Sequence, residues 1–249
     1  DTHNRNFRRA LEAAWGYALT GDAAMAGFTK RVLLGYAERY LQYPYHNNRQ
    51  RADGVDGGHI SEQTLGEASL TATCIAPAYD LVYDTLTAEE HAAVADGLLR
   101  PLLENLDRHK AGKSNWQSWH NAAMITGGML LGDAAWIRKA LDSPQHGFAF
   151  QMKASVTAEG MWYENSWGYH FYTLTALVHT AEAARRLGID LWRNPRFARM
   201  FTLPAQYILP GGKLPRFGDD VNTSAVRAFE MEAAYRALRE PALLAVLPA

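Results

Sequence analysis

The chain has 249 residues, of which 48% are hydrophobic and 20% are charged, and its formal net charge is −1. This length suits one large domain or two small ones, and the composition is ordinary for a globular protein. The near-zero charge gives no electrostatic argument for a nucleic-acid partner or an anionic membrane surface. No apolar stretch approaches the roughly 18 residues that a membrane-spanning helix needs.

Helical periodicity dominates from the start of the chain. The apolar spacing predicts helices over residues Phe7–Leu19, Ala24–Tyr43, Ser61–Tyr83, Thr87–Asp107, Trp119–Leu131, Ala134–Asp142, Gly147–Val156, Ser166–Leu187, Pro195–Ile208 and Thr223–Arg239. Thr87 and Glu90 are spaced as a capping box, and Asn194 before Pro195 is a helix start. Gly188 suits the position just after a helix end.

No run of alternating β-branched residues is long enough for a core strand, although Tyr207–Leu209 and Lys213–Phe217 could pair as a small hairpin. The chain is therefore expected to be all-α. Short connections make successive helices antiparallel neighbours, and a single row of such hairpins must curl to bury both faces. Since no repeat of about 34 or 40 residues is present, we expect an incomplete (α/α) toroid forming one domain over residues 1–249.

The remaining compositional features limit the chemistry. Cys74 is the only cysteine and lies in an apolar run, so we expect a buried thiol and no disulfide within the chain. Scattered histidines and a glycine-rich Asp53–Gly58 segment without a following Gly-Lys-Ser/Thr predict neither a metal site nor a cofactor. The chain opens without an initiator Met or a signal peptide, so we expect an excised part of a longer protein, which would be secreted or periplasmic.

The segment Ser114–Asn121 combines two indoles, carboxamides and an imidazole within eight residues. Indoles stack on sugar faces and carboxamides bind carboxylates and hydroxyls, so we expect a sugar-binding cleft. Asn115 suits a carboxylate ligand or a helix N-cap. His120 suits a charge-neutralising group or a core histidine. The candidate substrate contacts in this segment are Trp116, Gln117 and Trp119.

A second polar and aromatic segment, Glu159–Tyr172, follows about one helical hairpin later. Tyr169 and Tyr172 are three residues apart and share one helix face, whereas His170 points elsewhere. Packing in the core remains an alternative for each tyrosine. The further candidate substrate contacts are Trp162, Glu164, His170 and Tyr172.

The second segment resembles the heparinase II/III-like and alginate-lyase-like polysaccharide lyases, in which an acidic-Gly-x-x-x-Glu-x-Ser-x-x-Tyr-His-x-Tyr pattern is common. Glu159 stands where Asp is more usual, and Leu214–Asp219 resembles a Pro-x-x-Gly-Asp element of that group. The resemblance, which runs roughly from Gly57 to Asn222, implies a toroid followed by antiparallel β-sheet domains. It also implies a catalytic histidine from the β portion, and neither that portion nor this histidine is found in the chain.

The resemblance implies β-elimination from a 4-linked uronic-acid polymer, an acidic polysaccharide. Asn115 would neutralise the uronate carboxylate, with His120 as a second neutraliser five residues further on, which is more than one helical turn. Tyr169 would protonate the leaving O4, either as acid alone or also as the base that takes the C5 proton, with Tyr172 as second choice. To act as a base, a phenol needs a nearby cation, for which Arg216 or a histidine is a candidate.

Two other functions suit the same residues. A glycoside hydrolase needs two carboxylates, which Glu164 with Asp219 or Asp220 could supply. A non-catalytic glycan-binding domain would need only the aromatic and amide side chains. In either case Asn48 and Arg49, beside Asn47 and His59 at the edge of the glycine-rich loop, are candidate sugar contacts.

Overall fold

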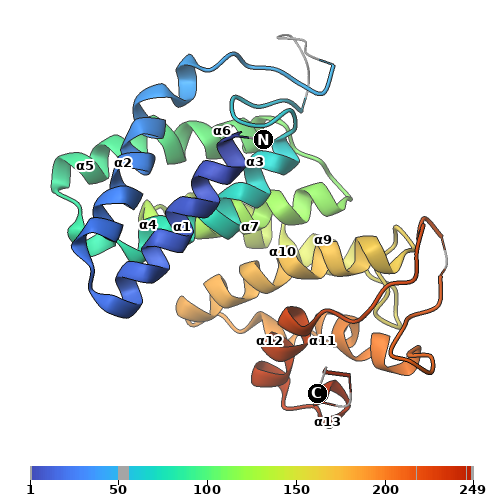
Figure 1. Ribbon diagram of the computed structural model, residues 1–249. Helices are drawn as coiled ribbons and strands as arrows, with labels where there is room; N and C mark the ends of the chain where they lie inside the picture. Colours follow the sequence, from blue (N-terminus) through green and yellow to red (C-terminus); the bar gives the residue numbers. More distant parts are fainter. Residues whose placement is uncertain (1, 50–55, 217, 245, 248–249) are drawn as a thin grey trace.

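A computed structural model describes residues 2–49, 56–216, 218–244 and 246–247 (Figure 1). In these ranges the chain forms helices and isolated antiparallel β-bridges, and no strand. The predicted all-α class is confirmed. None of the described helices is both long and apolar enough to cross a lipid bilayer.

The first part of the chain folds into hairpins of helices that pack on one another. Its elements are α1 (Thr2–Thr20), α2 (Ala23–Arg39), a 3₁₀ turn (Tyr40–Gln42), α3 (Thr64–Leu70), α4 (Ala76–Leu81), a second 3₁₀ turn (Tyr83–Thr85), α5 (Ala88–Val94) and α6 (Arg100–Arg108). Helix α1 packs against α2 and α4, and α2 packs against α5. The predicted capping box at the start of α5 is confirmed by reciprocal hydrogen bonds between Thr87 and Glu90.

Two of the predicted helices are each interrupted by a π turn. Thr71–Ile75 joins α3 to α4, and Ala95–Leu99 joins α5 to α6. Each π turn is followed two residues later by a proline, Pro77 or Pro101. A proline inside a helix removes one N–H donor and clashes with the carbonyl four residues earlier. The wider π turn moves the carbonyl away from the proline ring and so relieves the clash. The chain therefore continues in nearly the same direction.

The second part of the chain is arranged around the neighbouring helices α7 and α10 (Figure 1). Its elements are α7 (Asn115–Leu130), α8 (Ala134–Asp142), α9 (Phe148–Ala154), α10 (Trp167–Arg186), a 3₁₀ turn (Leu191–Arg193), α11 (Pro195–Thr202), a 3₁₀ turn (Pro204–Gln206), α12 (Ala228–Leu238) and α13 (Pro241–Leu244). Helix α7 also packs against α3 and α8. Small residues on α7 allow its close packing against α6 and α8, because a Cβ at Gly127 would lie within 3 Å of Leu103 and one at Gly128 within 3 Å of Trp136.

Several predicted boundaries were wrong for identifiable reasons. Helix α7 begins four residues before Trp119, because the Ser114 side chain accepts from the Gln117 N–H and caps it. Helix α11 ends at Thr202, before Pro204 starts a 3₁₀ turn. The predicted hairpin is reduced to the isolated bridges Leu209–Lys213 and Lys213–Ala225. The toroidal closure, the single-domain extent and the additional β-sheet domains stay predictions.

A buried carboxylate, which the sequence pattern did not single out, connects three segments of the first part. Glu67 on α3 is fully buried, and its oxygens accept from the N–H groups of His59 and Ile60, from the Tyr40 hydroxyl and from the Asn105 amide. Burial raises the pKa of Glu67, although these donors oppose the shift. The carboxylate therefore fixes the loop before α3 against the 3₁₀ turn after α2 and against α6.

Replacing Glu67 with alanine is expected to lower the free energy of unfolding by about 3 kcal/mol, because it leaves several buried donors without an acceptor. Urea unfolding followed by circular dichroism measures the loss. Glu62→Ala, an exposed position on the same loop, is the matched control and should change stability by less than about 0.5 kcal/mol. Equal losses in the two variants would contradict the anchoring role.

Candidate functional site

The start of α7 and the loop before α10 meet through one carboxylate. Asn115, the first residue of α7, donates from Nδ2 to both Glu164 oxygens at 2.9 and 2.8 Å, and from its main-chain N–H at 3.3 Å. The indole Nε1 of Trp162, a fully buried side chain, donates to the same carboxylate at 2.5 Å. The two sequence segments that were expected to face each other are thus in direct contact.

A second connection between the same loops involves a cation. The Tyr163 hydroxyl donates to the Lys113 carbonyl at 2.6 Å, and Lys113 Nζ lies 4.0 Å from the centre of the Tyr163 ring. Burial and the Glu164 charge raise the pKa of Tyr163, so its phenol stays protonated at neutral pH. Sequence reasoning missed Lys113, which immediately precedes the Ser114 cap and has no pattern of its own. In Figure 1 these loops, together with the loop between α11 and α12, lie on the right-hand side.

The hydrogen bonds of Asn115 leave part of its amide group unused. Seen from Nδ2, the two oxygens of Glu164 lie close together, whereas the two N–H bonds of an amide diverge widely. One N–H is therefore shared between both oxygens, and the other points away from Glu164. A carboxylate accepts but does not donate, so it also fixes which end of the amide faces it. Asn115 is buried, with 3% of its surface exposed, and the N–H that points away from Glu164 has no acceptor among the described residues.

Tyr169 lies in the first turn of α10, close to this cluster in the chain. Ser166 caps the helix by accepting from the Tyr169 N–H at 3.1 Å. The Asp220 carboxylate accepts from the N–H groups of Trp167 and Gly168 at 2.9 and 3.0 Å, at the positive end of the helix dipole. Tyr169 is 39% exposed, and its hydroxyl makes no hydrogen bond within the described residues, so it is accessible to a ligand.

The aromatic side chains differ in their access to solvent. Trp119 is buried and packs against half-buried Tyr172, with ring centres 5.2 Å apart and the ring planes tilted by 46°. Burial raises the pKa of Tyr172, which favours the protonated phenol. Trp116 is half-buried and is therefore the better placed indole for contact with a ligand. Arg216, at an exposed position, donates from Nε to the Asp220 carbonyl at 3.2 Å and so lies beside the start of α10.

Three of the predicted site residues point into the protein interior. Gln117 accepts from the Ala111 N–H and donates to Asn121, which fixes the loop before α7. His170 accepts from the Trp162 N–H and donates to the Met200 carbonyl, and burial lowers its pKa to about 4. His120 is fully buried, and burial lowers its pKa to about 3, with smaller contributions from His109 and His146. His120 is thus neutral at pH 7 and carries no positive charge that could neutralise a carboxylate.

The comparison with known proteins agrees with the geometry. A family model described as alginate lyase matches residues 5–213, which is most of the chain and includes both clusters. The chain belongs to the alginate lyase family. It is 28% identical over 193 residues to an alginate lyase of Stenotrophomonas maltophilia (strain K279a), covering 75% of the chain and 25% of that protein. It is 27% identical over 191 residues to an exo-oligoalginate lyase of Saccharophagus degradans, covering 74% and 25%.

The chain thus spans about a quarter of the length of each of these two relatives. Asn115, Glu164 and Tyr169 all lie inside the matched range, whereas Arg216 and Asp220 lie beyond it. The range matched by the family model thus covers the residues of both loops. The alginate-lyase part of the predicted resemblance is confirmed, and the heparinase-like part stays a prediction.

Two other predicted contacts of this alginate lyase family member lie on the segment between α2 and α3. Asn48 is exposed and lines an open pocket with residues of α1 and of the loop before α3, including His3, His46 and Gln63. The Arg49 N–H donates to the Asn47 side chain. Of the glycine-rich segment, residues 53–55 lie outside the described residues. No group of three or more His, Cys, Asp or Glu suited to a metal ion occurs in the described ranges.

The buried histidine makes stability depend on pH. An unfolded histidine binds a proton with a pKa of about 6.5, whereas folded His120 does so at about 3. Between these pH values the unfolded chain holds the extra proton, so the stability contribution is complete above pH 6.5 and is lost as the pH falls toward 3. We expect the melting temperature to fall below pH 6.5, and His120→Leu to reduce that dependence. An unchanged slope in this variant would contradict the assignment.

The loop before α10 needs a glycine at residue 160. Its φ is +105°, and a Cβ there would lie 2.6 Å from main-chain atoms of Arg199. Gly160→Ala is expected to lower the free energy of unfolding by about 3 kcal/mol and to displace Glu164. Gly211→Ala is the control, because residue 211 has a φ of +90° but open space around it. Chemical denaturation measures the free energy of unfolding of both variants. Both losses include the backbone strain of a positive φ, so the additional loss in Gly160→Ala measures the collision with Arg199.

Proposed function

We propose that the protein is a polysaccharide lyase that cleaves a 4-linked uronic-acid polymer, most closely alginate, by β-elimination. The observation that carries the proposal is the contact between Asn115 and Glu164, which brings an oriented amide donor beside the start of α10. Family membership and the names of the two relatives support the reaction class and the substrate. The proposal covers the protein of which this chain is a part, and it includes a β-sheet portion that contributes a catalytic histidine.

Asn115 would stabilise the charge that develops when the uronate loses its C5 proton. That proton is weakly acidic while the neighbouring carboxylate is negative, and abstraction adds charge to the carboxylate oxygens. The N–H of Asn115 that does not face Glu164 would donate to one of these oxygens and so favour the transition state. Because Glu164 holds the amide, this donor needs little rearrangement when substrate binds.

Tyr169 would transfer the protons. The C5 proton passes to a base, the C–H electron pair forms the C4–C5 double bond, and the C4–O4 bond breaks. The phenol of Tyr169 would donate its proton to the leaving O4. To take the C5 proton first, the phenol must lose its own, and a nearby cation would favour that loss. Lys113 joins Arg216 as a candidate, since both lie on loops at this end of α7 and α10.

The hydrogen bonds around the carboxylates favour a lyase over a glycoside hydrolase. A hydrolase needs one carboxylic acid and one carboxylate free to meet the sugar. Glu164 already accepts from Asn115 and Trp162, and Asp220 accepts from two N–H groups at the start of α10. Asp219 is exposed and could meet a sugar. A hydrolase would still need a second carboxylate, and Glu164 and Asp220 are both already hydrogen-bonded within the protein. A binding domain would not require the exposed Tyr169 phenol.

The test is a screen of the intact protein against alginate, heparan sulfate and hyaluronan, followed by ultraviolet absorbance of the unsaturated product. We expect turnover of alginate above that of the other polymers. The control is the same alginate with its carboxyl groups reduced to alcohols, which removes the acidity of the C5 proton and should abolish elimination. New reducing ends without ultraviolet absorbance would identify a hydrolase and overturn the proposal. Because such polymers cannot enter a cell, we also propose a secreted or periplasmic location.

A further inference from the structure

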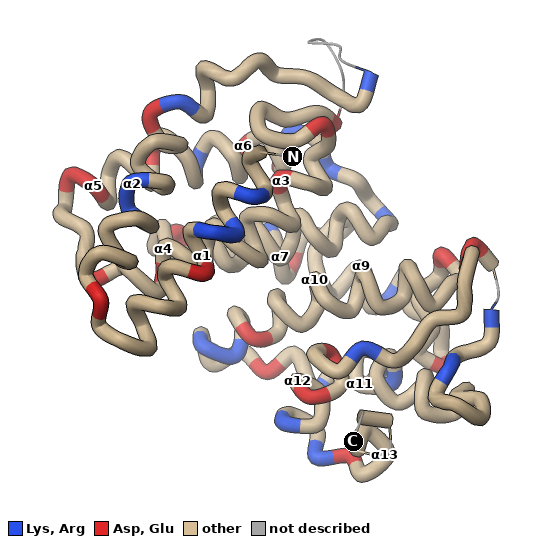
Figure 2. The backbone as a smooth tube through the Cα atoms, in the orientation of Figure 1, with Lys and Arg blue, Asp and Glu red and all other residues tan. Residues whose placement is uncertain are grey.

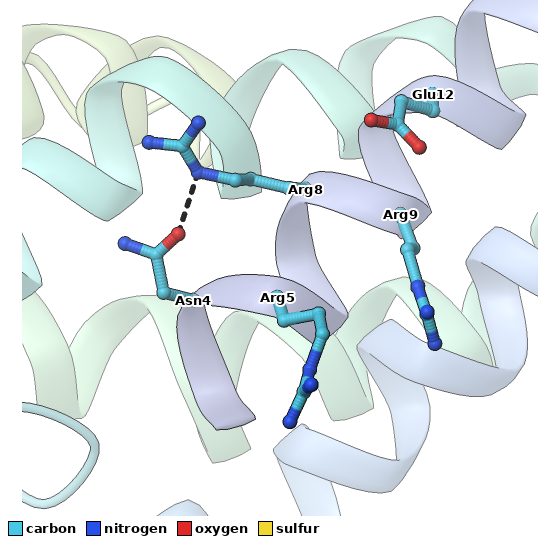
Figure 3. A pocket seen from close by; sticks show the side chains of 5 residues that line it. All are labelled: Asn4, Arg5, Arg8, Arg9 and Glu12. Carbon is cyan, nitrogen blue, oxygen red and sulfur yellow. Dashed lines mark hydrogen bonds between the residues drawn. The ribbon is translucent and has the colours of Figure 1, made fainter. Parts of the chain in front are cut away.

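A group of arginines on α1 lines an open pocket that shares no residue with the Asn115 cluster. The pocket, of about 490 Å³, is lined by Asn4, Arg5, Arg8, Arg9 and Glu12. Figure 3 shows Arg5 and Arg9 extending to one side of the helix, while Arg8 lies toward Asn4. Figure 2 shows basic segments following one another along α1, although the chain as a whole is nearly neutral. The pocket is therefore a local concentration of positive charge.

These charges are not neutralised within the fold. Arg5, Arg8 and Arg9 are exposed, and none forms an ion pair in the described part of the chain. Glu12 is three residues after Arg9 and four after Arg8, which is the spacing of helical ion pairs, but it contacts neither guanidinium. Arg5 and Arg9 are four residues apart, so they repel each other unless an anion lies between them.

One of the arginines is already oriented. Arg8 donates from Nε to the Asn4 side chain at 2.6 Å. This bond fixes the plane of the guanidinium and leaves its two terminal nitrogens free, and these form the fork that binds a carboxylate. Orientation before binding reduces the conformational entropy that a ligand must overcome.

An exposed indole lies on the same face of the helix. Trp15 is 52% exposed, and it follows Arg8 by seven residues, or two helical turns. The two side chains are therefore about 10 Å apart along the helix axis. Indole faces stack on sugar rings, as Arg forks bind carboxylates. Arg8 and Trp15 thus form an elongated surface along α1 that combines both functions, and Arg5 and Arg9 extend from the adjoining side of the helix.

We propose that this face of α1 is a second, non-catalytic binding site for an acidic polysaccharide. Arg5, Arg8 and Arg9 bind uronate carboxylates, and Trp15 stacks on a neighbouring sugar ring. The site rests on the proposed function for the identity of its ligand. It holds a long polymer on the protein while the Asn115 cluster acts on another part of the same chain, which raises the effective concentration of substrate.

The test compares two triple variants with equal net charge. Arg5→Gln/Arg8→Gln/Arg9→Gln removes the cluster, and Arg31→Gln/Arg138→Gln/Arg186→Gln removes three exposed arginines from α2, α8 and α10. Affinity for long alginate is measured by calorimetry at several salt concentrations. We expect the first variant to bind about fivefold more weakly, with a smaller salt dependence, and the second to bind as the unchanged protein does. Trp15→Ala should also weaken binding of the polymer.

A short oligosaccharide separates the α1 site from the Asn115 cluster. It cannot reach both sites at once, so its affinity for the Asn115 cluster should be equal in the unchanged protein and in the α1 variants, which lose only the binding of the oligosaccharide at the α1 site itself. Equal weakening in both triple variants would show an effect of net charge and overturn the proposal, as would unchanged affinity in both. An unchanged protein that binds alginate as expected but does not turn it over would instead count against the proposed function and not against the α1 site, since that site is measured by binding alone.

Discussion

Replacing Tyr169 with phenylalanine is expected to lower the rate of alginate cleavage by roughly 10²- to 10⁴-fold, because it removes the proton donor to the leaving oxygen. The change deletes one exposed hydroxyl that makes no hydrogen bond in the described structure. The fold and the substrate contacts of the ring should therefore be retained. Initial rates from ultraviolet absorbance give kcat and KM, and kcat should carry nearly all of the loss.

Two other tyrosine variants serve as controls. Tyr172→Phe removes a phenol that is half-buried against Trp119, and Tyr163→Phe removes the hydrogen bond to the Lys113 carbonyl. We expect each to lower activity by less than about tenfold, through small shifts of the site. If Tyr172→Phe abolishes activity while Tyr169→Phe does not, the proton-transfer role belongs to Tyr172. Full activity in all three variants would exclude a phenol from the reaction.

The convergence of two distant segments could be predicted from local composition, but the contacts that make it could not. Trp, Asn and Glu in a polar segment signal a binding site wherever they occur, so Asn115 and Glu164 were both chosen. That Glu164 binds Asn115 rather than substrate depends on the packing of α7 against α10, which no local pattern encodes. The same limit applies to His120 and His170, because identical side chains at a helix start are exposed or buried according to neighbours distant in sequence.

Helix type and approximate extent followed from periodicity, because a packed helix must place apolar residues on one stripe. The interruptions did not, since Pro77 and Pro101 fit the apolar pattern, which carries no sign of the missing N–H groups and ring clashes that the π turns accommodate. Glu67 was not predicted because its partners, Tyr40 and Asn105, lie on other helices. The arginines of α1 can be read from the sequence, but only the structure shows that they form no ion pair within the described residues.

Replacing Asn115 with alanine is expected to lower kcat by roughly 10²- to 10³-fold, the range seen when one oriented donor to a developing negative charge is removed. Glu164→Ala should produce a smaller loss of the same kind, because the amide of Asn115 then rotates freely and seldom faces the substrate. Glu164→Gln keeps one acceptor oxygen for the amide and should restore part of the activity. Both losses should appear in kcat rather than in KM.

The double variant decides whether Glu164 acts through Asn115. If Glu164 only positions the amide, adding Glu164→Ala to Asn115→Ala should cause no further loss, so the effects are strongly non-additive. If Glu164 contacts substrate or transfers a proton itself, the two losses multiply. Removing Glu164 also leaves the Trp162 indole without its acceptor, at a cost of about 1–3 kcal/mol in stability. Rates are therefore compared well below the melting temperature of each variant, the double variant included. Partial unfolding then cannot be mistaken for non-additive effects on kcat.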